Sequence, residues 1–404
     1  MRILFVAIAE SVHTARWISQ LNGKNWDVHL FPSDMGMTPH DDLRTLTIHS
    51  FFRRKGHSDP TTNRKGIYWP FRRGAGRLKQ ISERLAPSLA TESARLARTI
   101  RSLKPDIIHV LEMQSSGYLI LEAKRKLPGY LFPPCIYSSW GSDLFFFGQE
   151  AQHDKRIRAF LAECDYYIAD CQRDLSLTHE FGFKGKTLGV FPTAGGYDLE
   201  HMRQFRQMGS PSSRRVIALK GYENIRGAKA MVALQALQRC GDLLGGFQLV
   251  LYLASDETRR ALEELSWIKG LRVSELPYSP HDEIIKLMGR SRIAIGVGLS
   301  DGTPNAMLEA MVMGAFPIQS DTISTAEWIQ HGQNGLLVSA EDPESIALAI
   351  RRALTDDDLV NGAAVINAEI SEAKLDRRVI QPRLLQLYEK VAADEHLKVS
   401  TPGA

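Results

Sequence analysis

The chain has 404 residues, of which 44% are hydrophobic and 24% are charged, and its formal net charge is +4. This composition is close to the globular average, which disfavours disordered, collagen-like and coiled-coil proteins. So small a net charge disfavours a dedicated nucleic-acid binder. The length predicts two or three domains, each large enough for its own hydrophobic core.

The N-terminal segment and the cysteines indicate in which cellular compartment the protein resides. The apolar run at residues 3–9 resembles a signal peptide, but Glu10 ends it, whereas secretory signals extend over roughly 15–30 residues. No other apolar run approaches the roughly 18 residues of a membrane-spanning helix. The four cysteines show no C-x-x-C spacing. We therefore expect a cytoplasmic protein with reduced cysteines.

Short apolar runs alternate with amphipathic stretches along the first half of the chain. The predicted strands are residues 3–9, 26–31, 46–49, 106–111, 135–139, 166–169 and 187–191, and helices are predicted at 14–21 and 78–103. Strands that alternate with helices are typical of parallel βαβ units, so the pattern predicts a doubly wound sheet with helices on both faces.

The alternation is interrupted near residues 193–213, where glycine, serine and proline are typical of a linker. It resumes with predicted strands at residues 216–220, 248–253, 271–275, 293–297, 315–320 and 335–338. The predicted organisation is a first α/β domain over residues 1–195, a linker over 196–213, a second α/β domain over 214–378, and a C-terminal helix and tail over 379–404 that packs back on the first domain. A cleft between two such domains is a common ligand site.

The strongest local signal is the sequence Ser-Asp-Gly-Thr-Pro-Asn-Ala-Met-Leu-Glu-Ala at residues 300–310. Thr303 suits an N-cap and Pro304 suits the first helical position, so a helix is predicted to begin here. Gly302 lets a ligand approach the backbone closely. The free N–H groups at such a helix N-terminus form a site for an anion.

Two carboxylates flank this predicted helix start. Glu309 lies one turn after Asn305 on the same helix face, and a carboxylate there suits the hydroxyl pair of a ribose. Asp301, just before the helix, is placed to bind another polyol. The alternative is an ordinary helix start followed by an ordinary helix carboxylate.

This segment resembles the donor-site motif of the retaining GT-B glycosyltransferases of group 1 (family 4). Their motif commonly reads Glu-Gly-x-Pro-x4-Glu-Ala-Met-Ala-x-Gly-x-Pro, and this chain has Asp301-Gly302-Thr303-Pro304, Glu309-Ala310-Met311, Gly314 and Pro317. The match extends through residues 327–338. The resemblance implies two Rossmann-like domains facing a cleft. It also implies transfer of a sugar from a nucleotide-diphosphate sugar with retention of anomeric configuration and without a cofactor.

The resemblance also implies residue roles in donor binding. Glu309 would hold the nucleotide ribose, and Asp301 would contact the hydroxyls of the donor sugar. The backbone at residues 302–305 would hold that sugar and the diphosphate. Asp301 replaces the family's first glutamate, which keeps the charge but shortens the reach.

Two cations are candidates for stabilising the departing diphosphate. Lys220 closes a predicted strand, and Arg226 follows in the next loop or helix start. The resemblance implies a Gly-Arg-x4-Lys-Gly pair on the phosphates. In this chain the order is reversed and the spacing is one residue longer, and Arg226 fits the Lys-Gly position because Gly227 follows it. The alternative places both cations on a solvated rim.

Candidate residues on the acceptor side follow two predicted strands, where ligands bind to parallel sheets. His109 ends an Asp-x-x-His strand, and Asp143 ends a loop that resembles the family's His-Gly-x-Asp. Trp140 stands in that loop where many relatives carry a functional histidine, and it could stack on a sugar face. We therefore expect His109 or Asp143 to take the polar role, or the donor's own phosphate. His109 as a packed strand-end histidine is the alternative.

The loop after the first strand faces the same cleft if this fold is right. Ser11 and His13 are its candidates for contact with the acceptor. Metal-ligand spacing is lacking among the twelve histidines, so no metal is predicted.

Residues 51–79 are both basic and aromatic. Their nine lysines and arginines are opposed only by Asp59, and five aromatic residues lie among them. Such a surface suits anionic lipid headgroups and indicates peripheral contact with a membrane. A mobile, solvated loop is the alternative.

The sequence therefore predicts a metal-independent glycosyltransferase acting on a glycan, lipid-linked or small-molecule acceptor. Two alternatives stay open. A sugar-nucleotide epimerase on the same fold would need a general acid/base pair at the anomeric face, and none is evident. A non-catalytic subunit that binds a nucleotide sugar stays open because of Trp140.

Overall fold

The computed structural model describes residues 1–36, 38–54, 59–71, 73–223, 227–266, 268–322 and 324–400, with side chains as far as residue 394. The chain forms two compact units. The first contains residues 1–196 together with those from 380 onward, and the second contains residues 197–379. Each unit is built on its own parallel sheet.

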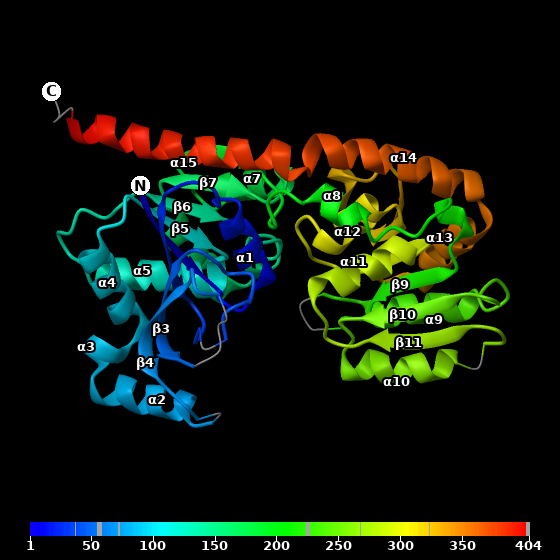
Figure 1. The fold of residues 1–404 in the computed structure, drawn as a ribbon, viewed down its shortest axis with the longest axis horizontal. Coiled ribbons are helices and arrows are strands. Elements are labelled where there is room, and N and C mark those ends of the chain that lie inside the picture. The colour runs from blue at the N-terminus through cyan, green and yellow to red at the C-terminus, as the bar shows by residue number, and fades with distance from the viewer. Residues whose placement is uncertain are drawn as a thin grey trace. The chain divides into compact units, whose positions relative to one another are not determined.

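The first unit contains, among its described residues, an eight-stranded parallel sheet in the order β4-β3-β2-β1-β5-β6-β7-β8 (Figure 1). Its strands are β1 (Arg2–Ala7), β2 (Asp27–Pro32), β3 (Thr47–Arg53), β4 (Asn63–Tyr68), β5 (Ile107–Leu111), β6 (Cys135–Ser138), β7 (Tyr166–Ala169) and β8 (Lys186–Val190). The central strands β1 and β5 are buried along almost their whole length, because helices cover both faces of the sheet.

Helices of the first unit follow the strands in chain order. They are α1 (Val12–Ser19), α2 (Ala75–Leu85), α3 (Pro87–Ala90), α4 (Glu92–Leu103), α5 (Tyr118–Arg125), α6 (Ala151–Leu161), α7 (Gln172–Glu180) and α15 (Arg377–Ser400). The single helix predicted over residues 78–103 is therefore wrong, since this stretch forms α2, α3 and α4. Pro87 has no N–H to continue α2, and Ala86 before it takes φ −139° and ψ 63°, outside the helical region.

Strand β4 was not predicted, and it lies within the basic stretch at residues 51–79. Nearly all of its residues are exposed at the sheet edge, so it lacks the apolar run that indicates a buried strand. The alternative of a solvated loop is thus wrong for residues 63–68. Phe51 and Phe52 of the same stretch are buried in β3, and residues 55–58 and 72 lie outside the described part of the chain.

The C-terminal helix α15 packs on the core of the first unit, which confirms that prediction. Ile380, Leu384, Tyr388 and Val391 are buried there and recur at helical spacing, so one face of α15 covers the sheet. Residues 197–213 of the linker predicted at 196–213 are instead part of the second unit. They contain α8 (Leu199–Arg203) and a 3₁₀ turn at Pro211–Ser213.

The second unit contains, in its described part, a six-stranded parallel sheet in the order β11-β10-β9-β12-β13-β14 (Figure 1). Its strands are β9 (Val216–Lys220), β10 (Gln248–Tyr252), β11 (Arg272–Leu276), β12 (Ile293–Gly296), β13 (Phe316–Ser320) and β14 (Leu336–Val338). Its remaining helices are α9 (Ala230–Arg239), α10 (Asp256–Leu265), α11 (His281–Arg290), α12 (Asn305–Met313), α13 (Pro343–Thr355) and α14 (Asp357–Lys374). The prediction of two Rossmann-like α/β domains is confirmed.

Within the described residues, no helix has both the length and the apolar character that crossing a bilayer requires.

Candidate functional site

The loop from β12 leads directly into the N-terminus of α12. Pro304 has φ −64° and ψ 113°, which is extended, so helical geometry begins at Asn305. Pro304 therefore occupies the capping position, and the prediction that Thr303 caps the helix is wrong by one residue. Thr303 is buried just before the helix. The N-terminus of α12 thus lies at the carboxyl edge of the sheet, at the place where the sequence predicts an anion site.

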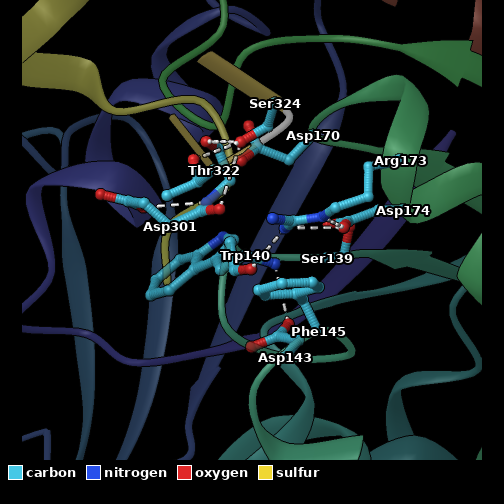
Figure 2. Close-up of polar contacts among 12 residues, drawn as sticks. Ser139, Trp140, Asp143, Phe145, Asp170, Arg173, Asp174, Asp301, Thr322 and Ser324 are labelled. Carbon is cyan, nitrogen blue, oxygen red and sulfur yellow. Dashed lines mark hydrogen bonds and ion pairs between the residues drawn. The ribbon is translucent and has the colours of Figure 1, made fainter. Parts of the chain in front are cut away.

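Hydrogen bonds hold this loop in place. Ser324 donates its hydroxyl to the carbonyl of Gly302 at 2.7 Å, and the N–H of Gly302 donates to Asp301 Oδ1 at 3.0 Å. Figure 2 shows Asp301 and Ser324 beside Thr322, whose hydroxyl lies 3.1 Å from that of Ser324. Asp301 is half-buried, so its carboxylate is fixed by the backbone and still reaches solvent.

Glu309 is the most buried carboxylate of the predicted donor site, with only 4% of the residue exposed. Its Oε1 lies 2.7 Å from Nε2 of His281, the first residue of α11. Glu309 also contributes, after burial, to raising the pKa of the Tyr252 hydroxyl. His281 was missed in the sequence, since it lies 28 residues before Glu309 and no local motif marks it.

Asn305 lies one turn before Glu309 on α12. Its Oδ1 accepts a hydrogen bond from the Tyr197 hydroxyl at 2.8 Å. Asn305 and Glu309 are thus each positioned by a residue from a distant part of the second unit.

Lys220 ends β9, which lies between β10 and β12, so its side chain belongs to the same carboxyl edge as the α12 N-terminus. The residue is half-buried and lies in register with Tyr252 on β10. Among the described residues, its ammonium makes no ion pair, which leaves it available to an anionic ligand. Arg226, the second predicted cation, lies outside the described residues.

His109 is a core residue, and the alternative of a packed strand-end histidine holds for it. The residue is fully buried on β5. Its Nδ1 lies 2.6 Å from the Tyr388 hydroxyl, and its Nε2 lies 2.8 Å from the hydroxyl of Ser138. Burial lowers the pKa of His109 to about 3. This geometry does not support a catalytic His109, because the residue lies in the middle of β5 and Tyr388 of α15 packs against it.

Asp143 anchors its own loop instead of facing solvent. Its Oδ2 accepts the N–H groups of Met113 and Trp140 at 3.0 and 2.8 Å, and the hydroxyl of Tyr137 donates to the same atom at 2.9 Å. The residue is 3% exposed, and burial together with Glu112 raises the pKa of its carboxyl well above the ordinary value. A direct catalytic role for Asp143 is not supported by this geometry.

Glu112, at the end of β5, is a residue that the sequence did not reveal. It takes φ +75°, which is rare for a residue with a side chain. Its carboxylate accepts the N–H groups of Gln114, Ser115 and Ser116, the first turn of the helix that follows β5. These bonds hold an unfavourable backbone conformation at the carboxyl edge of the first sheet, where such strain is typical of functional loops.

Ser11, His13 and Trp140 lie at that same edge. Ser11 caps α1 by accepting the N–H of His13 at 3.2 Å. The rings of His13 and Trp140 are 5.5 Å apart in an edge-to-face arrangement. The structure therefore brings two of the three predicted acceptor-side residues into contact, with both rings partly exposed.

Arg173 of α7 fixes the loop that carries Trp140. It pairs with the fully buried Asp174 at 2.9 Å, donates to the carbonyl of Gly141 at 3.1 Å and lies 4.1 Å from the centre of the Phe145 ring. Figure 2 shows the guanidinium between Asp174 and Phe145. Arg173 and Phe145 were not singled out in the sequence, because their contacts join the segment after β6 to α7.

Replacing Arg173 by Met is expected to destabilise the first unit by about 3–5 kcal/mol, because the buried carboxylate of Asp174 loses its counterion. Urea unfolding measures the change. Lys24→Met is the matched control, since its pair with Glu389 is exposed and should contribute at most about 1 kcal/mol. Equal effects of the two substitutions would contradict the role given to Arg173.

Among the described residues, no group of three or more His, Cys, Asp or Glu side chains is arranged to hold a metal ion. All four cysteines are free and buried.

Comparisons with known proteins identify both domains. Residues 2–171 match the family model of glycosyl transferase 4-like domains, and residues 222–356 match that of glycosyl transferases group 1. A search of the curated proteins finds no significant sequence match.

Solved structures show the same fold at low sequence identity. HepE from Anabaena, in complex with UDP and glucose, is 14% identical with a TM-score of 0.64, and the match covers 96% of this chain and 100% of that one. Sucrose-phosphate synthase from Thermosynechococcus elongatus is 16% identical, with a TM-score of 0.68 and coverage of 98% and 100%. A glycosyltransferase from Rickettsia africae is 13% identical, with a TM-score of 0.61 and coverage of 96% and 98%.

The paired Rossmann-like units and the two domain matches, which together span most of the chain, show that this protein is a glycosyltransferase of the GT-B fold with a group 1 domain in its second unit, and that it transfers a glycosyl group from a nucleotide sugar.

Proposed function

We propose that the chain transfers the sugar of a nucleoside diphosphate sugar, with retention of anomeric configuration and without a metal ion, to a glycan, lipid-linked or small-molecule acceptor. The observation that carries the donor assignment is Glu309, a buried carboxylate held by His281 on the helix whose N-terminus forms the anion site. Complexes of Anabaena HepE with UDP and with UDP-glucose support a nucleotide sugar as the donor.

The parts of the nucleotide sugar fit distinct groups of the second unit. A carboxylate repels phosphate but accepts hydrogen bonds from a ribose diol, so Glu309 binds the ribose. The N-terminus of α12 and the ammonium of Lys220 bind the diphosphate, which gains negative charge as the glycosidic bond breaks. Asp301, half-buried beside the same helix tip, accepts hydrogen bonds from hydroxyls of the donor sugar.

Retention follows from where the acceptor proton goes. In the first unit, His109 and Asp143 are buried and already hydrogen-bonded within the core, so neither is a free general base. The departing diphosphate oxygen then takes the proton of the acceptor hydroxyl on the same face of the sugar from which it leaves. Attack on that face retains the anomeric configuration. Cationic and helix-dipole groups, rather than a metal ion, stabilise the leaving group.

Thermal unfolding of the full chain with UDP, GDP or ADP, and with their sugar conjugates, tests the donor site. A nucleotide present at about 100 times its dissociation constant should stabilise the protein by about 2.7 kcal/mol. The same shift is expected with and without EDTA. If no nucleotide shifts the transition, or if EDTA abolishes the shift, the donor site or its metal independence is wrong. Incubation of the matching nucleotide sugar with acceptors, followed by NMR of the product, reads the anomeric configuration.

Replacing Lys220 by Met is expected to lower kcat by about 10²–10³-fold, the usual loss when one group that stabilises a developing negative charge is removed. The matched control is Lys286→Met, whose ammonium pairs with Glu283 at the surface and should leave kcat unchanged. Initial rates with saturating nucleotide sugar measure the effect. A kcat equal to that of the control would remove Lys220 from the mechanism.

A further inference from the structure

Helix α2 of the first unit exposes an apolar face to solvent. Leu78, Ile81 and Leu85 recur at helical spacing and are 38, 50 and 81% exposed. Within α2, only Ala75 is buried. An amphipathic helix normally turns its apolar face to the core. Helix α2 instead turns its apolar face to solvent, where a binding partner would cover it.

The apolar surface continues on both sides of α2. Ile67 and Phe71 precede the helix and Leu89 of α3 follows it, and all three are exposed. Figure 1 shows α2 and α3 next to β4 at the edge of the first sheet. We call residues 67–71 and 73–89 the α2 surface.

A small hydrophobic cluster attaches the α2 surface to the sheet. Phe51 and Phe52 of β3 pack with Ala75, and Trp69 and Ala90 pack against them. The exposed leucines therefore lie on an anchored helix and not on a frayed segment. Within the stretch at residues 51–79 that was predicted to contact a membrane, Phe51 and Phe52 face the core, and the exposed apolar residues lie further along the chain.

Positive charge surrounds these apolar side chains. Residues 63–89 contain seven lysines and arginines and a single acidic residue, Glu83. Arg77 and Arg84 are exposed next to the leucines of α2. Beside α3, α4 forms a shallow groove of about 470 Å³ lined by Arg95, Arg98, Thr99, Arg101 and Ser102. Arg98 donates a hydrogen bond to the carbonyl of Leu89, which connects this basic groove to the α2 surface.

We propose that the α2 surface docks on an anionic lipid bilayer, with Leu78, Ile81 and Leu85 in the boundary between headgroups and acyl chains and the surrounding arginines on lipid phosphates. The charge distribution favours this occupant over a second copy of the chain. In a symmetric dimer through this surface, the two sets of cations would face each other, and the only carboxylate of each α2 surface, Glu83, already pairs with Lys79. The inference does not depend on the proposed function.

Co-flotation of the full-length chain with lipid vesicles tests this inference. The vesicles contain phosphatidylethanolamine and phosphatidylglycerol in equal parts, or phosphatidylcholine alone. The apolar variant combines Leu78→Gln, Ile81→Gln and Leu85→Gln, and the charge variant combines Arg77→Glu with Arg84→Glu. The matched control combines Leu348→Gln, Val365→Gln and Ile366→Gln, which are exposed apolar residues of the second unit.

The wild-type chain and the control should bind the anionic vesicles and not the phosphatidylcholine vesicles, and high salt should weaken binding. Each arginine removed should weaken binding by about fivefold, and the apolar variant by at least about tenfold. Thermal unfolding and nucleotide binding of every variant show whether the fold is intact.

Three results would overturn the inference. Wild-type protein that does not float with anionic vesicles has no such surface. Apolar and charge variants that float as well as the control place the contact elsewhere. A wild-type dimer that the apolar variant converts to a monomer, seen by sedimentation equilibrium, makes a second copy the occupant.

Discussion

Replacing Glu309 by Gln is expected to lower kcat/KM for the nucleotide sugar by about 10²–10⁴-fold. Two hydrogen bonds from a ribose diol to a carboxylate each contribute about 1.5–3 kcal/mol, and an amide cannot accept both with the same strength. The Glu309 side chain is buried and hydrogen-bonded to His281, so we expect a large loss of ribose binding if water takes the place of its carboxylate. Steady-state kinetics against the nucleotide sugar identified by thermal unfolding measure the change.

A nucleotide that lacks one ribose hydroxyl separates this role from a general loss of structure. In the wild-type enzyme, the 2′-deoxy donor should be a far poorer substrate than the ribose donor. In Glu309→Gln that discrimination should largely disappear, because the carboxylate that senses the hydroxyl is gone. Glu344→Gln on the surface of α13 is the matched control and should keep full discrimination. Discrimination retained in Glu309→Gln would place the ribose elsewhere.

His281 positions Glu309 and should show a smaller, graded effect. His281→Ala removes the group that orients the carboxylate, and we expect KM for the donor to rise by about tenfold while kcat changes little. His281→Gln can donate a hydrogen bond to the same oxygen and should recover part of the loss. If His281 had a purely structural role, His281→Gln would not recover the loss and neither variant would change the discrimination between ribose and 2′-deoxy donors.

The residues of the proposed donor site could be selected from the sequence because they lie close together in it. Asp301, Pro304 and Glu309 lie within nine positions of one another, and a helix start fixes their spacing. The error over Thr303 concerns one residue at a helix boundary. His281 was not readable, since its contact with Glu309 depends on how α11 packs beside α12.

The first unit contains contacts that could not be predicted from short stretches of the sequence. His109 was expected at the end of a strand, where ligands commonly bind, but it lies in the middle of β5 and is hydrogen-bonded to a hydroxyl 279 residues later in the sequence. Asp143 is likewise bonded within the core, by Met113 30 residues earlier and by Tyr137 and Trp140 of its own segment. Strand β4 departed from the apolar pattern that predicts strands, because its residues are exposed at the sheet edge. The alternation of strands and helices still predicted the two-domain fold, since each βαβ unit is local.

The burial of His109 predicts that acid destabilises the first unit. The hydroxyl of Tyr388 accepts the indole N–H of Trp17 at 2.9 Å, so its own hydrogen is available to Nδ1 of His109. The opposite ring nitrogen then donates to Ser138, and the neutral imidazole is fully hydrogen-bonded. An imidazolium would donate at both ring nitrogens, so the Tyr388 hydroxyl could no longer donate to Nδ1 and would have to accept there instead, inside a shell of aromatic rings.

The sign of the effect follows from the lowered pKa of about 3 for His109 against an ordinary value of 6.5. Below pH 6.5 the unfolded chain binds a proton that the folded chain does not, so the contribution of the neutral imidazole is complete above pH 6.5 and is lost as the pH falls toward 3. The loss is about 1.4 kcal/mol per pH unit, hence about 2 kcal/mol between pH 6.5 and 5. His49, whose pKa burial and His29 lower to about 4, adds a loss of the same sign.

His109→Gln isolates this contribution, because glutamine keeps a donor and an acceptor but does not titrate. The variant is expected to be less stable than the wild type at pH 7 by about 1–3 kcal/mol, and the difference should shrink by about 2 kcal/mol at pH 5. Hydrogen exchange at the amides of β5 reports the opening of the first unit itself, since this central strand exchanges only when the core unfolds. His201→Gln, an exposed position of the second unit, is the control and should leave the pH dependence unchanged. A difference between wild type and His109→Gln that stays constant from pH 7 to pH 5 would mean that His109 titrates with the same pKa in the folded and the unfolded chain, and that its place in the core does not exclude charge as the hydrogen-bond pattern requires.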